Sequence, residues 1–270
     1  MPFQQFGFLG QTAQQYISKH RSEHAELFKI ADELNEIAQG FIPLLAIKSD
    51  DIQQLTCVSL YIRIMSSYSS AIKLLEYGLS LDAGNVIRSA VESSIYLNAC
   101  ATNTEFVDSY HYSKEIFRLK MINISLNGED GAIPVTEENK ATLLAIKEEI
   151  EGLKKVGKVK ELNLREVAKS CEMLPVYNTA YRLLSNQNSH SSSESLKQIQ
   201  KRDASGNITG IMWQPDLEEI GLYISTLGTA LLSGFYGLIK VLAIPKEDLK
   251  PLEVKMEKCW DRMQEAWPER

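Results

Sequence analysis

The stretch Ile220–Ile239, IGLYISTLGTALLSGFYGLI, contains no charged side chain, although 24% of the whole chain is charged. Its 20 residues are enough to cross a bilayer as a helix. Four glycines and several serine, threonine and tyrosine residues keep its apolar character modest. A helix that is apolar on all sides either spans a membrane or lies at the centre of a helical bundle. The rest of the chain offers amphipathic partners, so we predict the bundle and no membrane span.

Helical periodicity fills most of the chain on both sides of this stretch. It predicts a long helix over 11–39, further helices from residue 51 onward, and an amphipathic last helix over 246–266. Only residues 205–213 are typical of strands, and they predict one small hairpin. The predicted fold class is all-α: an irregular multi-helix bundle in a single domain over residues 1–270. Its core is expected over about 50–243, with the first and last helices packed on it.

Composition and charge narrow the class of protein. A hydrophobic fraction of 44% is typical of a globular chain. The net charge of −6 gives no support for a non-specific nucleic-acid coat, although it leaves room for a local basic patch. The N-terminal residues lack the basic start and apolar run of a secretory signal. The chain has four cysteines far apart in sequence, Cys57, Cys100, Cys171 and Cys259. Their spacing favours reduced thiols in the protein core, so we expect the protein in the reducing cytoplasm.

Two histidines of the first predicted helix have the spacing H-x-x-E-H, from His20 to His24. One helical turn separates their imidazoles, so they are weak candidates for a shared metal ion, with Glu23 as a base. The alternative is a helix–helix contact on an inward apolar stripe, and we favour it, with no metal and no cofactor. Asp108 and His111 have the spacing of one half of a di-iron site, but the second half is missing, which favours a polar helix face.

Two other stretches concentrate polar side chains. Arg88 and Glu92 lie at i, i+4 on one face of a predicted helix, where an ordinary intrahelical salt bridge is the alternative to a functional role. The stretch 177–191 brings a cation, hydroxyls, amides and a histidine to one helix end. Helix capping is the alternative there, because Asn and Ser side chains satisfy free backbone groups. The candidate residues of this stretch are Tyr181, Arg182, Ser185, Asn186 and His190.

Three segments together resemble one family. They are LLEYGLSLDAGNVIRSAVESSIYL at 74–97, YRLLSNQNSHSS at 181–192 and RDASGNITGIMWQPD at 202–216. They are similar to an E-x-G helix end followed by R-S-x-x-E, a tyrosine–Leu-Ser–histidine segment, and a short hairpin before the last core helix. The family is the bacterial domain-of-unknown-function family 5677, whose layout is similar to that of the HEPN helical proteins. The resemblance covers about residues 50–243, and it carries over to Arg88, Glu92, Tyr181, Ser185 and His190.

Many HEPN proteins cut RNA in toxin or defence systems, so the resemblance implies a metal-independent ribonuclease or an RNA-binding protein. His190 would be the general acid and base, with Arg182 or Arg88 on the phosphate and Glu92 beside them. Tyr181, Ser185 and Asn186 would contact the substrate. Lys197 and Lys201, with Arg202, would steer its phosphates. In this chain seven residues lie between Arg182 and His190, and Ser191 follows the histidine where the HEPN pattern has proline.

A second function fits the same residues. In a non-catalytic scaffold or partner-binding module, Arg88, Glu92, Tyr181 and His190 would form a buried polar network that fixes the helix register. The resemblance also implies a homodimer, because HEPN-like proteins commonly pair two copies of the site. RNA, a second copy or a protein partner are therefore the expected partners, and DNA and membranes are not.

Overall fold

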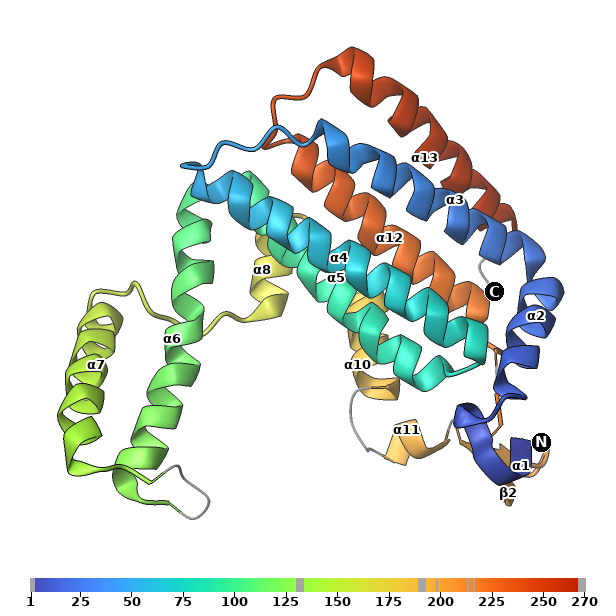
Figure 1. Cartoon of the computed structure of the whole chain (residues 1–270), viewed down its shortest axis with the longest axis horizontal. Helices are drawn as coiled ribbons and strands as arrows, with labels where there is room; N and C mark the ends of the chain where they lie inside the picture. Colours follow the sequence, from blue (N-terminus) through green and yellow to red (C-terminus); the bar gives the residue numbers. More distant parts are fainter. Residues whose placement is uncertain are drawn as a thin grey trace.

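The computed structural model describes residues 3–129, 134–188, 193–197, 199–212, 214–215 and 217–266 of the chain. They form a helical bundle with one small antiparallel sheet (Figure 1), so the all-α prediction with a hairpin is confirmed. Three helices form the centre: α4 (Ile52–Tyr77), α5 (Ser80–Thr102) and α12 (Ile220–Ile239). The helices α3 (Ala25–Phe41) and α13 (Lys246–Ala266) pack on each other and on α12.

The uncharged helix α12 packs against α3, α4, α5 and α13. By length and composition it is apolar enough to cross a membrane, but 67% of its most apolar window is buried inside the protein. Its glycines permit this close packing: a Cβ at Gly234 would lie 2.8 Å from Ile64 Cδ1, and one at Gly237 would collide with Leu97. The uncharged stretch therefore occupies the position predicted for it, at the centre of the bundle.

The first long helix differs from the prediction. The predicted helix over 11–39 is divided into α2 (Ala13–Glu23) and α3. Two short elements precede it, α1 (Phe3–Phe6) and η1 (Gly7–Leu9). The break lies at His24, whose φ of −121° and ψ of 39° are not helical. Its cause is tertiary: Arg21 at the end of α2 binds both Glu76 of α4 and Asp32 of α3. Periodicity along the chain carries no information on such a contact, so it does not predict the break.

The helices α6 (Thr104–Asn127) and α7 (Glu137–Lys155) form an antiparallel arm that projects from the bundle (Figure 1). The arm has a hydrophobic cluster of its own, separate from the main core: Leu119, Ile122, Ile150 and Val159. The helix α8 (Leu164–Ser170) then returns to α5.

Short elements connect α8 to the central helix. They are α9 (Leu174–Val176), η3 (Tyr177–Tyr181), α10 (Arg182–Gln187), α11 (Ser193–Lys197), and the hairpin of β1 (Gln200–Arg202) and β2 (Ile208–Ile211). The hairpin begins earlier than the predicted 205–213, because the glycine-containing stretch 203–207 forms its turn and Gln200 pairs with Ile211. Both strands are short and largely exposed, so the hairpin adds little to the core.

Three of the four cysteines are buried, which agrees with their interpretation as core thiols. Burial raises the pKa of Cys57 and of Cys100 to about 12 and that of Cys259 to about 11. Because the thiolate is the reactive form, we expect the buried thiols to react with Ellman's reagent at least ~100-fold more slowly in native than in guanidinium-denatured protein. The half-buried Cys171 is expected to react first. Immediate reaction of two or more thiols in the native state would contradict this.

Candidate functional site

The two polar stretches singled out in the sequence meet at one place. Arg88 of α5 donates a hydrogen bond from Nη1 to the Tyr181 hydroxyl at 2.6 Å, across 93 positions of sequence. The same Nη1 lies 3.4 Å from Glu92 Oε2 one turn along α5. The Arg88 Cζ also lies 5.1 Å from the centre of the Tyr181 ring, within the range of a cation–π contact. The predicted meeting of Arg88, Glu92 and Tyr181 is therefore present in the fold.

A π-helical turn, η3, presents the tyrosine to Arg88. It spans Tyr177–Tyr181, directly after the one-turn helix α9, and it packs against α5. The rings of Tyr177 and Tyr181 are stacked, with centroids 5.3 Å apart and planes 18° apart. π-Helical turns are rare in proteins, but those that occur are frequently found at functional sites. They change the direction of side chains that an α-helix would place elsewhere.

We refer to Arg88, Glu92, Tyr177 and Tyr181 together as the Arg88 cluster, and this cluster is open to solvent. The side chain of Arg88 is 28% exposed and that of Glu92 36%. Both tyrosines of the π-helical turn are partly exposed as well. An ion pair of such exposure contributes little to stability, typically below about 1 kcal/mol. The cluster is thus accessible to a ligand and differs from the sealed polar network of the scaffold hypothesis.

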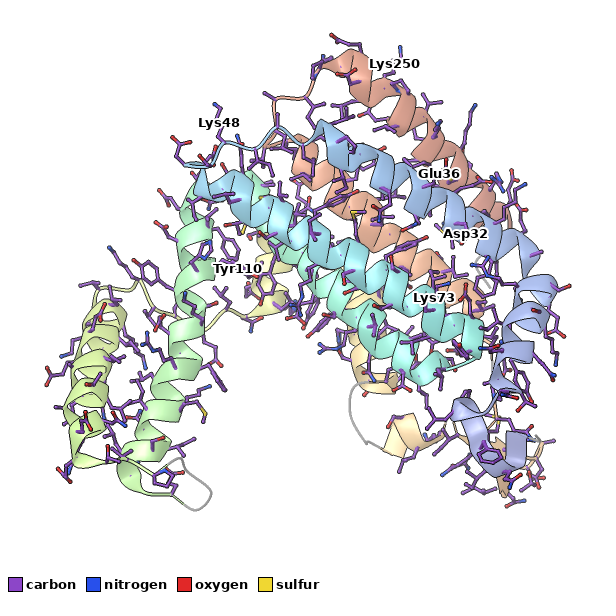
Figure 2. All side chains as sticks on the ribbon, viewed as in Figure 1. Asp32, Glu36, Lys48, Lys73, Tyr110 and Lys250 are labelled. Atoms are coloured by element: carbon purple, nitrogen blue, oxygen red, sulfur yellow. The ribbon has the colours of Figure 1, made fainter. Side chains whose placement is uncertain are left out.

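Two further tyrosines extend the cluster toward α6. Tyr96 of α5 and Tyr110 of α6 have ring centroids 5.1 Å apart (Tyr110 is labelled in Figure 2). Burial, with the charge of Glu92 second, raises the pKa of Tyr96 to about 12 and also raises the pKa of Tyr181. Burial likewise raises the pKa of Tyr110. All three phenols therefore remain neutral at physiological pH and keep a proton to donate.

A groove adjoins these tyrosines between α4 and α6. It has a volume of 520 Å³, and its lining includes Arg63, Tyr110 and His111. Arg63 reaches Ser89 of α5 at 3.5 Å, and His111 Nε2 lies 2.8 Å from the Thr56 hydroxyl. The sequence indicates only a polar helix face at His111, because a groove between two helices leaves no signal in the periodicity of either one.

The other predicted site residues are spread along the connecting segment. Arg182, Asn186, Lys197 and Lys201 are exposed, Lys201 on the hairpin strand β1. Ser185 is half-buried, and its hydroxyl has no hydrogen-bond partner among the described residues. His190 lies outside the described residues. The described contacts bring none of these exposed cations onto Arg88.

Asn188, which the sequence indicates only as a capping residue, anchors the segment before His190. It is 9% exposed and packs against Gly84 of α5, where any Cβ would collide with its amide. Its Nδ2 donates to the Leu81 carbonyl and to the Tyr223 hydroxyl, both at 3.3 Å. This part of the segment is therefore structural, fixed to the first turns of α5.

His20 and His24 occupy different surroundings. His20 is buried and its Nδ1 lies 2.9 Å from the Glu76 carbonyl, so it makes the helix–helix contact favoured from the sequence. His24 is half-buried at the junction of α2 and α3, and the prediction that it lies on the inward stripe of a continuous helix is wrong. Within the described residues, no group of three His, Cys, Asp or Glu side chains could hold a metal ion.

A family model described as "Family of unknown function (DUF5677)" matches residues 54–208, more than half of the chain. The chain belongs to the DUF5677 family. No curated protein and no solved structure matches it. The matched DUF5677 region runs from α4 to the start of β2 and contains the Arg88 cluster, the π-helical turn and all lining residues of the groove except Ile52.

Within the DUF5677 region, two of the motifs that carried the resemblance have different surroundings. In the E-x-G stretch, Glu76 is buried and bound by Arg21 and Lys73, and Gly78 ends α4 in a left-handed conformation. In the R-S-x-x-E stretch, Arg88 and Glu92 are open to solvent. The first motif therefore holds the fold together, whereas the second is available to a ligand.

Proposed function

We propose that this DUF5677 protein is a cytoplasmic, HEPN-like RNA-binding protein that receives single-stranded RNA on the Arg88 cluster and cleaves it without a metal ion. The observation that carries the proposal is the contact of Arg88 with Tyr181, whose ring is stacked on that of Tyr177, on a partly exposed face. Single-stranded RNA is recognised through bases stacked on aromatic rings and phosphates bound by arginine.

The hydrogen-bonding capacity of Arg88 supports phosphate binding. Only its Nη1 is used, by Tyr181 and Glu92, and its other N–H groups have no partner among the described residues. A guanidinium offers a permanently charged fork that matches two phosphate oxygens. Arg63, on the adjoining groove, and the exposed Arg182 supply further positive charge.

The proposed cleavage assigns the proton transfers to His190. The histidine takes the proton of a ribose 2′-hydroxyl, and the 2′-oxygen then attacks phosphorus. The bond from phosphorus to the 5′-oxygen breaks, and the leaving oxygen receives a proton, so the products are a 2′,3′-cyclic phosphate and a 5′-hydroxyl. Imidazole suits both transfers because it titrates near neutral pH. Arg88 would stabilise the charge on the phosphorane, and two sites would face each other in a homodimer.

Replacing Arg88 by glutamine is expected to weaken binding of a fluorescein-labelled 15-nucleotide RNA about tenfold in EDTA, measured by fluorescence anisotropy at low salt. The matched control is Arg118→Gln, which removes one cation from another intrahelical ion pair, with Glu115 on the arm. We expect the control to change the affinity less than about twofold. Equal losses of RNA affinity in the two variants would mean that RNA binding depends only on the net charge of the protein, and would contradict the proposal.

Cleavage is tested separately, on gels of 5′-labelled RNA in EDTA. We expect His190→Ala to abolish product formation and to retain RNA binding, with His111→Ala as the comparison because His111 lines the adjoining groove. RNA left intact by the wild-type chain would limit the function to binding.

The non-catalytic scaffold remains the alternative, and the pairing of Glu92 with Arg88 favours it, because a carboxylate beside the guanidinium competes with phosphate. In that case His190→Ala would lower the melting temperature, and neither His190→Ala nor Arg88→Gln would change RNA affinity or RNA integrity.

A further inference from the structure

A second cavity, of 430 Å³, lies between α12 and α13 and shares no lining residue with the Arg88 cluster. This volume is within the range of small-molecule sites, roughly 300–1,000 Å³. Its lining combines two aromatic side chains, two methionines, two carboxylates and one buried amide. We refer to it as the α12–α13 cavity.

Aromatic rings from both helices border the α12–α13 cavity, Tyr236 of α12 and Trp260 of α13, and the buried Met256 lies with them. The faces of tyrosine and tryptophan attract cations, most strongly where water is excluded. Burial, followed by the charges of Glu257 and Glu253, raises the pKa of Tyr236, so its phenol stays neutral. The walls therefore suit a positively charged ligand that also has an apolar body.

Carboxylates follow one side of the α12–α13 cavity along α13. Glu257 and Asp261 line it one helical turn apart, and Glu253 lies one turn before them, near Tyr236. None of the three forms an ion pair or a hydrogen bond with any described residue. Like charges at i, i+4 repel each other and destabilise a helix. A bound cation would remove that repulsion.

The buried amide in the lining of the α12–α13 cavity has an unused acceptor. Asn98 of α5 is only 7% exposed. Its Nδ2 donates to the carbonyls of Ser94 and Ser233, at 3.0 and 2.9 Å. Its Oδ1 accepts no hydrogen bond from the described residues, so this oxygen is available to a ligand in the cavity. The unused polar atoms of Asn98, Glu257 and Asp261 are therefore all acceptors, which calls for a ligand that donates.

We infer that the α12–α13 cavity binds a free aliphatic diamine or polyamine. Its ammonium groups would donate to Asn98, Glu257 and Asp261, and its methylene chain would pack between Tyr236 and Trp260. Carboxylates one turn apart on a helix are separated by roughly 5–6 Å at Cβ, which matches ammonium groups joined by a short methylene chain. This binding is independent of the proposed action on RNA.

Isothermal titration calorimetry with spermidine tests the inference on the full chain. We expect saturable one-to-one binding, and no binding of the uncharged probe 1,4-butanediol. The double variant Glu257→Gln/Asp261→Asn is expected to raise the Kd for spermidine at least about tenfold. Both carboxylates are exposed and unpaired, so this variant is expected to fold.

The matched control is Glu247→Gln/Glu265→Gln, which removes two exposed charges of α13 that do not line the cavity. It is expected to keep the wild-type Kd within about twofold. Trp260→Leu, which leaves the net charge unchanged, is expected to weaken spermidine binding at least about fivefold. Equal losses in the two double variants, equal binding of butanediol, or no saturable heat with millimolar spermidine would each overturn the inference.

Discussion

Replacing Gly78 by alanine is expected to destabilise the folded chain by about 3 kcal/mol, a large effect for the addition of a single methyl group. Gly78 ends α4 with a φ of +74°, where a side chain is strained, and its N–H is bonded to the carbonyls of Leu74 and Leu75. A Cβ there would also lie 2.5 Å from the Pro215 Cβ and 2.9 Å from the His20 Cε1. The substitution thus combines backbone strain with the displacement of two packed segments.

The control for Gly78→Ala is Gly128→Ala. Gly128 ends α6 in the same left-handed conformation, with a φ of +63°, but no atom lies within 4 Å of an added Cβ. Only the backbone strain applies there, about 1 kcal/mol. Urea unfolding followed by circular dichroism measures both changes. Equal losses in the two variants would show that the contacts of Gly78 with Pro215 and His20 contribute nothing.

Replacing Arg21 by methionine is expected to cost about 2–3 kcal/mol, because it removes the main partner of a buried carboxylate. The side chain of Glu76 is only 3% exposed, and Arg21 donates to its Oε1 at 2.6 and 2.8 Å. Lys73 remains at 2.9 Å but is itself 70% exposed. Arg21 also binds Asp32, which raises the pKa of the guanidinium and ties α2 to α3.

A second substitution is expected to restore the stability that Arg21→Met removes. The double variant Arg21→Met/Glu76→Leu replaces the buried pair with apolar groups, and such replacements are often neutral. We expect it to recover most of the lost stability in the same urea titration. Arg165→Met, which breaks an exposed pair with Glu166, is the control and is expected to cost less than about 0.5 kcal/mol. A double variant no more stable than Arg21→Met would contradict the explanation that the unpaired buried charge of Glu76 causes the loss of stability.

Much of the fold follows from local patterns in the sequence. The uncharged stretch predicts α12 and its central position, and the amphipathic pattern over 246–266 predicts α13. The break at His24 is not predicted because it depends on the contacts of Arg21 with two other helices. The separation of the α6–α7 arm is also not predicted. Apolar periodicity shows that a helix has a buried face, but it does not show whether that face packs on the main core or on a small separate cluster.

The site is predicted less completely. The i, i+4 spacing places Arg88 and Glu92 on one face, and the polar stretch marks Tyr181. The π-helical turn and its stacked Tyr177 are not predicted, because their hydrogen-bond register leaves no compositional signal. Arg63 joins the site through Ser89 of a neighbouring helix. The α12–α13 cavity depends on side chains from three separate helices, which no pattern within one helix indicates.

The central position of α12 has a consequence for synthesis on the ribosome. Translation proceeds from the N-terminus, and α3, α4 and α5 bury their apolar faces against a helix that begins only at Ile220. For most of translation the emerging chain therefore exposes apolar surface that nothing in the same molecule covers. We expect nascent chains that stop before α12 to aggregate or to bind chaperones, and cooperative folding to await the emergence of α12 from the ribosome.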